Sequence, residues 1–96
     1  MSTAPLLIVN PRSGGGKTGK IFASMQSVIE ARLGTVEVAF TEHAGHGIEL
    51  ARAGAERGHP LIVAVGGDGT FNEVVNGVML SGVATKVGII GQGTGG

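Results

Sequence analysis

Residues 61–73 have the sequence LIVAVGGDGTFNE, in which an apolar run leads directly into glycines and one carboxylate. The run Leu61–Val65 predicts a strand buried on both faces, as strands of a parallel sheet are. The apolar residues of 71–78 recur at helical spacing. Because parallel sheets bind ligands outside the carboxyl ends of their strands, this unit predicts a ligand site at residues 66–73.

The glycine-rich loop favours a phosphate or nucleotide as that ligand. Glycines let a ligand approach the backbone closely, and Asp68 is the only aspartate in the chain. The alternative is an ordinary turn, in which Thr70 caps the helix and Glu73 completes a capping box. Capping accounts for Thr70 and Glu73 but leaves the glycines around Asp68 unexplained, so a phosphate site is the favoured interpretation.

The rest of the chain repeats the alternation of strand and helix patterns. The expected strands are residues 6–9, 36–40, 61–65 and 87–90, and the expected helices are residues 21–33, 44–55 and 71–80. This alternation predicts parallel βαβ units and therefore a three-layer α/β fold of the nucleotide-binding kind. Since Gly91–Gly96 ends the chain where a further helix is expected, we expect a truncated domain from a longer protein.

Composition narrows the class of protein. Apolar residues make up 42% of the chain and charged residues 15%, which indicates a single globular domain. The formal net charge is zero and no basic tract is present, so nucleic acid is not an expected partner. The absence of cysteine, of a signal peptide and of any apolar run near the about 20 residues of a membrane helix predicts a cytoplasmic protein without a transmembrane segment.

Two other glycine motifs resemble known binding signatures only weakly. A P-loop needs glycine five residues before Gly16, but that position is Pro11, which has no N–H to offer a phosphate. Gly14, Gly16 and Gly19 have the spacing of a dinucleotide-binding loop, yet in a chain with 19 glycines this match carries little weight.

The remaining candidates are single polar residues. His43 and His46 are three residues apart and could be metal ligands, but solvated turn histidines are the favoured interpretation because no Asp or Cys stands nearby. No metal site is therefore predicted from them. Arg12 and Lys17 lie around the glycine-rich loop after the first expected strand, where their positive charges could contact a phosphate. No Ser–His–Asp or Cys–His arrangement supports nucleophilic catalysis.

Three motifs taken together resemble the catalytic domain of diacylglycerol kinases, a family that includes bacterial lipid kinases and sphingosine kinases. They are Asn10-Pro11-Arg12-Ser13-Gly14, then Thr41, and then Gly66-Gly67-Asp68-Gly69-Thr70, each directly after an expected strand. The resemblance runs from Asn10 to Thr94 in the order of the family. NAD kinases share the Gly-Gly-Asp-Gly loop, and the first motif favours the lipid kinases over them.

This resemblance implies that ATP binds across the carboxyl ends of the strands, with its phosphates on Gly66–Thr70. Asp68 would be catalytic, through Mg²⁺ or by orienting the nucleophile, and the amides of Gly67 and Gly69 would hold phosphate oxygens. The other implied nucleotide contacts are Asn10, Pro11, Arg12, Ser13, Gly14, Thr41, Gly66, Thr70, Asn72, Glu73, Gly93 and Thr94. For Thr41, capping of the helix that follows is an open alternative.

The fourth element departs from the family pattern Pro-x-Gly-Thr-x-Asn-Asp. The chain has Gly91-Gln92-Gly93-Thr94-Gly95-Gly96, so only Gly93 and Thr94 match. Family members also carry a β-rich second domain that supplies the expected general base and magnesium ligands. Residues 1–96 are therefore expected to be the N-terminal nucleotide-binding domain of a lipid kinase, inactive alone, with most magnesium ligands elsewhere.

The complete protein would then transfer the γ-phosphoryl group of ATP to a lipid hydroxyl, such as that of diacylglycerol. The alternatives are an NAD-kinase-like enzyme and a non-catalytic nucleotide-binding or interaction module. The lipid acceptor is expected to contact mainly the part of the protein outside this chain. Peripheral contact with a membrane surface, and a homo-oligomer formed along the edge at Val87–Ile90, are also left open.

Overall fold

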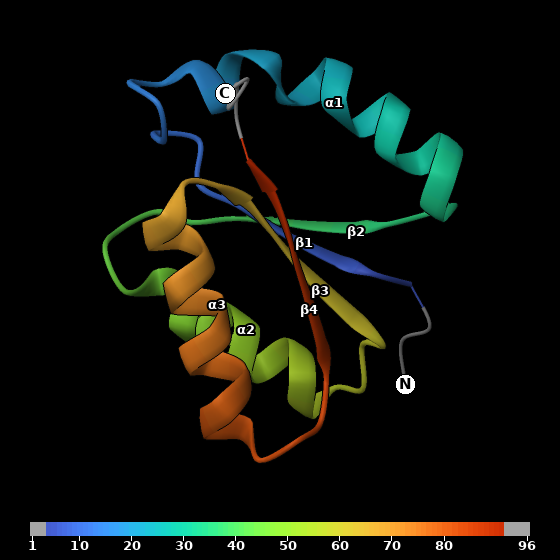
Figure 1. The fold of residues 1–96 in the computed structure, drawn as a ribbon, viewed down its shortest axis with the longest axis vertical. Helices are drawn as coiled ribbons and strands as arrows, with labels where there is room; N and C mark the ends of the chain where they lie inside the picture. Colours follow the sequence, from blue (N-terminus) through green and yellow to red (C-terminus); the bar gives the residue numbers. More distant parts are fainter. Residues whose placement is uncertain (1–3, 92–96) are drawn as a thin grey trace.

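The computed structural model describes residues 4–91, which form a four-stranded sheet with helices on both faces (Figure 1). In chain order the elements are β1 (Leu6–Val9), α1 (Lys17–Leu33), β2 (Glu37–Phe40), α2 (His46–Glu56), β3 (Leu61–Gly66), α3 (Asp68–Ser81) and β4 (Lys86–Gly91). The alternation predicted from the sequence is confirmed. Helices α1 and α3 begin before their first apolar residue, because their first turns consist of glycine, charged residues and one buried threonine each, and so carry no hydrophobic period.

All four strands are parallel, in the order β2-β1-β3-β4. β1 is central and buried along its whole length. Its last residue, Val9, pairs with Phe40 of β2 and with Val65 of β3, and Gly66 pairs with Gly91 of β4. The loops that follow the strands therefore leave the sheet at one edge.

The two faces of the sheet are covered by separate cores. α1 lies over one face, and α2 and α3 lie over the other (Figure 1). Because neighbouring residues of a strand point to opposite faces, β1 and β3 contribute alternate residues to each core. The α1 side contains Leu7, Val9, Phe22, Ile29, Val36, Val63 and Val65. The other side contains Leu6, Ile8, Ala51, Ala55, Ile62, Ala64, Val74 and Val78.

A glycine in α3 allows α2 to pack closely against it. A Cβ at Gly77 would overlap the carbonyl oxygen of Ile48 and lie 2.7 Å from the Cβ of Ala51. The close approach sets the position of α2, and with it the loop that joins β2 to α2. Within residues 4–91, no helix combines the length and the apolar character that crossing a membrane requires.

The substitution Gly77→Ala should lower the free energy of unfolding by about 1–3 kcal/mol, because the added methyl must force the helices apart. Equilibrium unfolding in urea measures this change. Gly69→Ala is the matched control, since it lies in the same helix with no atom within 4 Å of its Cβ. There alanine should be neutral or stabilising by up to about 1 kcal/mol. Equal unfolding midpoints for the two variants would contradict the packing argument.

Candidate functional site

Two hollows lie at the edge where the strands end, and they meet at Ser13 and Gly67, which line both. The first has a volume of about 310 Å³ and is lined by Asn10, Arg12, Ser13, Thr41, His43, Ala44, Gly67, Gly69, Thr70 and Glu73. The second has a volume of about 510 Å³ and is lined by Ser13, Gly14, Gly66, Gly67, Asp68, Ile89 and Gly91. The loops after β1, β2 and β3, together with the end of β4, thus contribute to one concave region.

Most of the residues expected to contact a ligand line these hollows, but two of them do not. The carbonyl oxygen of Pro11 accepts the N–H of Gly19 at 3.1 Å, so Pro11 joins its loop to α1. Asn72 is exposed on α3, and its carbonyl oxygen accepts the side-chain amide of Asn76 at 2.9 Å. Gly93 and Thr94 lie outside the described residues.

Four lining residues were not among the expected contacts: His43, Ala44, Ile89 and Gly91. His43 and Ala44 lie two and three residues after Thr41, so their position next to an expected contact could have identified them as lining residues. Ile89 belongs to the exposed edge strand, and only the pairing of β4 with β3 brings it beside Gly66 and Asp68.

The loop after β1 is held by Asn10. Its N–H donates to the carbonyl oxygen of Val65 at 3.0 Å, and its side-chain Oδ1 accepts the N–H of Arg12 at 3.1 Å. The carbonyl oxygen of Asn10 also accepts the N–H of Ser13 at 3.1 Å. These bonds place Ser13 against the loop after β3, where its Oγ lies 3.6 Å from a Cβ built on Gly67.

Arg12 joins the loop after β1 to the end of β2. Its Nη2 donates to the carbonyl oxygen of Thr41 at 3.2 Å and to the Thr41 Oγ1 at 3.4 Å. Helix α2 has Gly45 as its N-cap, so the expected alternative that Thr41 caps this helix is wrong. A guanidinium group has five N–H donors, and this pairing leaves Arg12 able to donate to an anion in the first hollow.

The turn from β3 into α3 contains glycines of two kinds. A Cβ at Gly66, where φ is 153°, would lie 2.7 Å from Thr70 Oγ1, so this position needs glycine for packing. A Cβ at Gly69 would have no atom within 4 Å, and one at Gly67 would make only an ordinary contact. Within residues 4–91, packing therefore explains Gly66 but gives no reason for glycine at positions 67 and 69.

The first turn of α3 presents free backbone donors beside these glycines. Gly67 is the N-cap, and no described side chain caps the helix. The first N–H groups of a helix lack acceptors within the helix, and the helix dipole attracts negative charge there. Asp68, the first residue of α3, is exposed, and no hydrogen bond or ion pair joins its carboxylate to another of residues 4–91.

Glu73 does not form the capping box that was the alternative for this loop. Because α3 begins at Asp68, Thr70 lies inside the helix and cannot cap it. The Glu73 carboxylate instead accepts two N–H groups at the start of α2, from Gly45 at 3.1 Å and from Gly47 at 2.9 Å. Glu73 therefore holds the β2–α2 loop, which forms one wall of the first hollow.

The substitution Glu73→Gln should lower the free energy of unfolding by about 1–3 kcal/mol, since the amide replaces one of two charged acceptors with a donor. Urea unfolding measures the loss, and amide hydrogen exchange should show reduced protection at Gly45 and Gly47. Glu56→Gln is the control, because its ion pair with Arg52 is half-exposed and contributes less than about 1 kcal/mol. Unchanged protection at both glycines would contradict this role of Glu73.

The parallel sheet and the glycine-rich loops at its carboxyl edge define an α/β domain with the pattern of the diacylglycerol kinases. Residues 4–96 match the family model described as "Diacylglycerol kinase catalytic domain". The chain belongs to the diacylglycerol kinase catalytic domain family. The resemblance inferred from the three sequence motifs is therefore confirmed.

The similar proteins are lipid kinases. "Sphingoid long-chain bases kinase 1" of Arabidopsis thaliana is 38% identical over 96 residues, which cover 93% of this chain and 13% of that protein. The "Diacylglycerol kinase" of Staphylococcus haemolyticus is 37% identical over 89 residues, which cover 92% of this chain and 27% of that protein. The chain thus spans less than a third of the length of these relatives.

A solved structure of a diacylglycerol kinase from Bacillus anthracis str. Sterne has the same fold. It superposes with a TM-score of 0.80 at 28% sequence identity, over 95% of this chain and 33% of that one. The predicted parallel α/β fold is therefore confirmed by both the structure and its neighbour.

Proposed function

We propose that this chain is the nucleotide-binding domain of a lipid kinase, which transfers the γ-phosphoryl group of ATP to a lipid hydroxyl such as that of diacylglycerol. Family membership supports a kinase, and the names of the relatives support a lipid acceptor rather than NAD. The chain corresponds to about a third of the solved relative, and the proposal assigns most acceptor contacts to the rest of the protein.

The observation that carries the nucleotide proposal is the open space beside Gly67 and Gly69. Neither glycine is required by packing among the described residues, and both line the first hollow beside the free amides of α3. A phosphate there can approach the backbone to a distance that a side chain at either position would prevent. The two hollows each fall within the roughly 300–1,000 Å³ of small-molecule sites.

Asp68 and Arg12 are the charged groups that act on the nucleotide. Arg12 donates to a phosphate oxygen while its Nη2 stays on Thr41, which keeps the walls of the first hollow in place. Asp68 fits a Mg²⁺ site, since this ion typically takes one or two protein carboxylates together with phosphate oxygens. When bound, Mg²⁺ neutralises the charge of the transferred phosphoryl group.

ATP binding by this chain should depend on the open glycines. Titration of ATP with Mg²⁺ by calorimetry should show saturable binding, weakened by Gly69→Ala and by Asp68→Asn, although neither variant should change the free energy of unfolding by more than about 1 kcal/mol. Gly88→Ala is the matched control, because its Cβ would make an ordinary contact at 3.7 Å with Val63, away from both hollows. Equal affinities in all four proteins would contradict the proposed site.

The lipid kinase reaction itself is tested in the longer protein that contains this chain. With diacylglycerol and sphingoid bases as acceptors, Asp68→Asn should reduce turnover at least about a hundredfold, because the amide would hold less firmly the Mg²⁺ that would neutralise negative charge during transfer. The 96-residue chain alone should not phosphorylate these lipids. Efficient lipid phosphorylation by the isolated chain, or phosphorylation of NAD by the longer protein, would overturn this assignment.

A further inference from the structure

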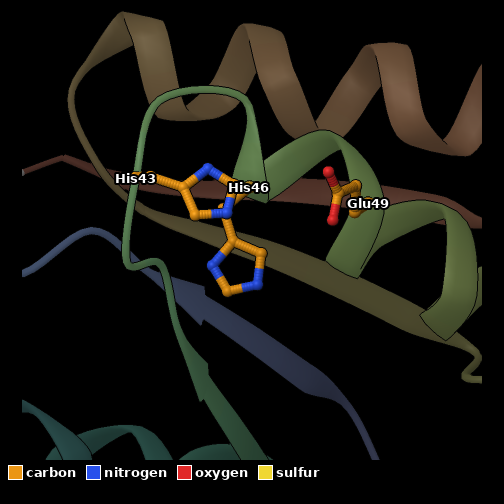
Figure 2. Close-up of side chains that lie close together, drawn as sticks. All are labelled: His43, His46 and Glu49. Carbon is orange, nitrogen blue, oxygen red and sulfur yellow. The ribbon is translucent and has the colours of Figure 1, made fainter.

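We propose that His43, His46 and Glu49 form a binding site for a transition-metal ion of the zinc class at the start of α2 (Figure 2). One ligand atom from each side chain lies within 4.8 Å of the other two. Two imidazoles and a carboxylate suit Zn²⁺ and its neighbours, whereas Mg²⁺ prefers oxygen ligands alone. His43 also lines the first hollow, but the proposal does not rest on the proposed function.

The backbone around α2 brings the three side chains together. His46 and Glu49 are three residues apart in the first turns of α2, so they lie on the same side of the helix. The His46 N–H donates to the carbonyl oxygen of His43 at 3.1 Å, which closes the turn between the two histidines. Their rings are stacked, with centroids 4.6 Å apart and planes inclined by 15°. Glu73 holds this same turn through Gly45 and Gly47.

The hydrogen bonds of His43 leave one ring nitrogen ready to bind a metal. Its Nδ1 lies 3.0 Å from the carbonyl oxygen of Ala44, and a carbonyl can only accept, so Nδ1 carries the proton. In the neutral ring this leaves the lone pair on Nε2. Histidine ligands of metals commonly donate their other ring N–H to a backbone carbonyl in this way, which fixes the tautomer and the orientation of the ring.

His46 has to exchange one partner for the metal. Its Nδ1 accepts the N–H of Glu42 at 2.9 Å, so its neutral ring carries the proton on Nε2. Binding through Nδ1 replaces the Glu42 N–H directly, and binding through Nε2 moves the proton to Nδ1 with the same result. Glu42 is exposed, so its N–H can donate to water when the metal takes its place at His46. The exchange therefore has a low cost in free energy. Metal binding must therefore change the environment of the Glu42 amide.

The side chains must rotate to bring the three ligand atoms to a metal ion, because an imidazole binds a metal in the plane of its ring and the two rings are stacked here. Ligands at the usual zinc distances of a tetrahedral site lie about 3.3 Å apart, somewhat closer than the three side chains do here. His43 and Glu49 are exposed, so their side chains can rotate without disturbing a core. Water would complete the coordination. Among residues 4–91, this is the one group of three His, Cys, Asp or Glu side chains that converges in this way.

The test is a calorimetric titration of ZnCl₂ into the tag-free chain, in a buffer that does not bind zinc. We expect saturable binding of one ion, no comparable signal with MgCl₂, and a shift of the Glu42 amide resonance when zinc is added. His43→Gln and Glu49→Gln should each weaken binding by at least about tenfold. Glu42→Gln removes a neighbouring exposed carboxylate that is outside the group, and it should leave the affinity within about twofold.

Circular dichroism of each variant verifies that it is folded. His43→Gln is the most informative variant, since its ring makes no hydrogen bond to another element in the described part of the chain. The proposal is overturned if the folded chain shows no saturable zinc binding. It is also overturned if His43→Gln and Glu49→Gln bind zinc as tightly as Glu42→Gln does. Neither result depends on whether the chain binds ATP, so the two proposals fail separately.

Discussion

The parallel pairing of β1 with β2 and β3 is the constraint on which the rest of the structure depends. Val9 lies level with Phe40 and Val65, so the three strands end together, and the loops that follow meet at one edge. β1 is buried on both faces, which requires helices above and below it. Both hollows lie where the strands end, outside the two apolar cores.

Side chains that bridge neighbouring loops turn this edge into a defined concave region. Arg12 connects the loop after β1 to Thr41 at the end of β2, and Glu73 connects α3 to the start of α2. Each bridge uses a charged group and backbone partners, an arrangement stronger than a neutral hydrogen bond. Arg12 and Glu73 thus build the walls of the first hollow, while Gly67 and Gly69 leave it open.

The glycines of this chain have different physical roles despite their similar appearance in the sequence. Gly77 and Gly66 face neighbouring atoms that leave no room for a side chain. Gly67 and Gly69 face open space, although they lie in the same turn as Gly66. Packing therefore requires glycine at positions 66 and 77 but not at positions 67 and 69. The difference follows from distances across the turn, which a glycine-rich sequence does not reveal.

The sequence by itself determined the order of strands and helices, the buried strands and the family, because hydrophobic period and local motifs depend on neighbouring residues. It also placed the ligand-facing loops at one edge, since parallel strands impose that arrangement. Only the tertiary structure decided what Glu73, Thr41, His43 and Ile89 do. The partners of Glu73, Thr41 and Ile89 lie on other elements, and His43 faces the loop after β1 and the turn into α3 across the first hollow, so helix starts, close packing and the pairing of β4 with β3 set these positions. The convergence of His43, His46 and Glu49 likewise came from the turn into α2, where spacing alone had favoured solvated histidines.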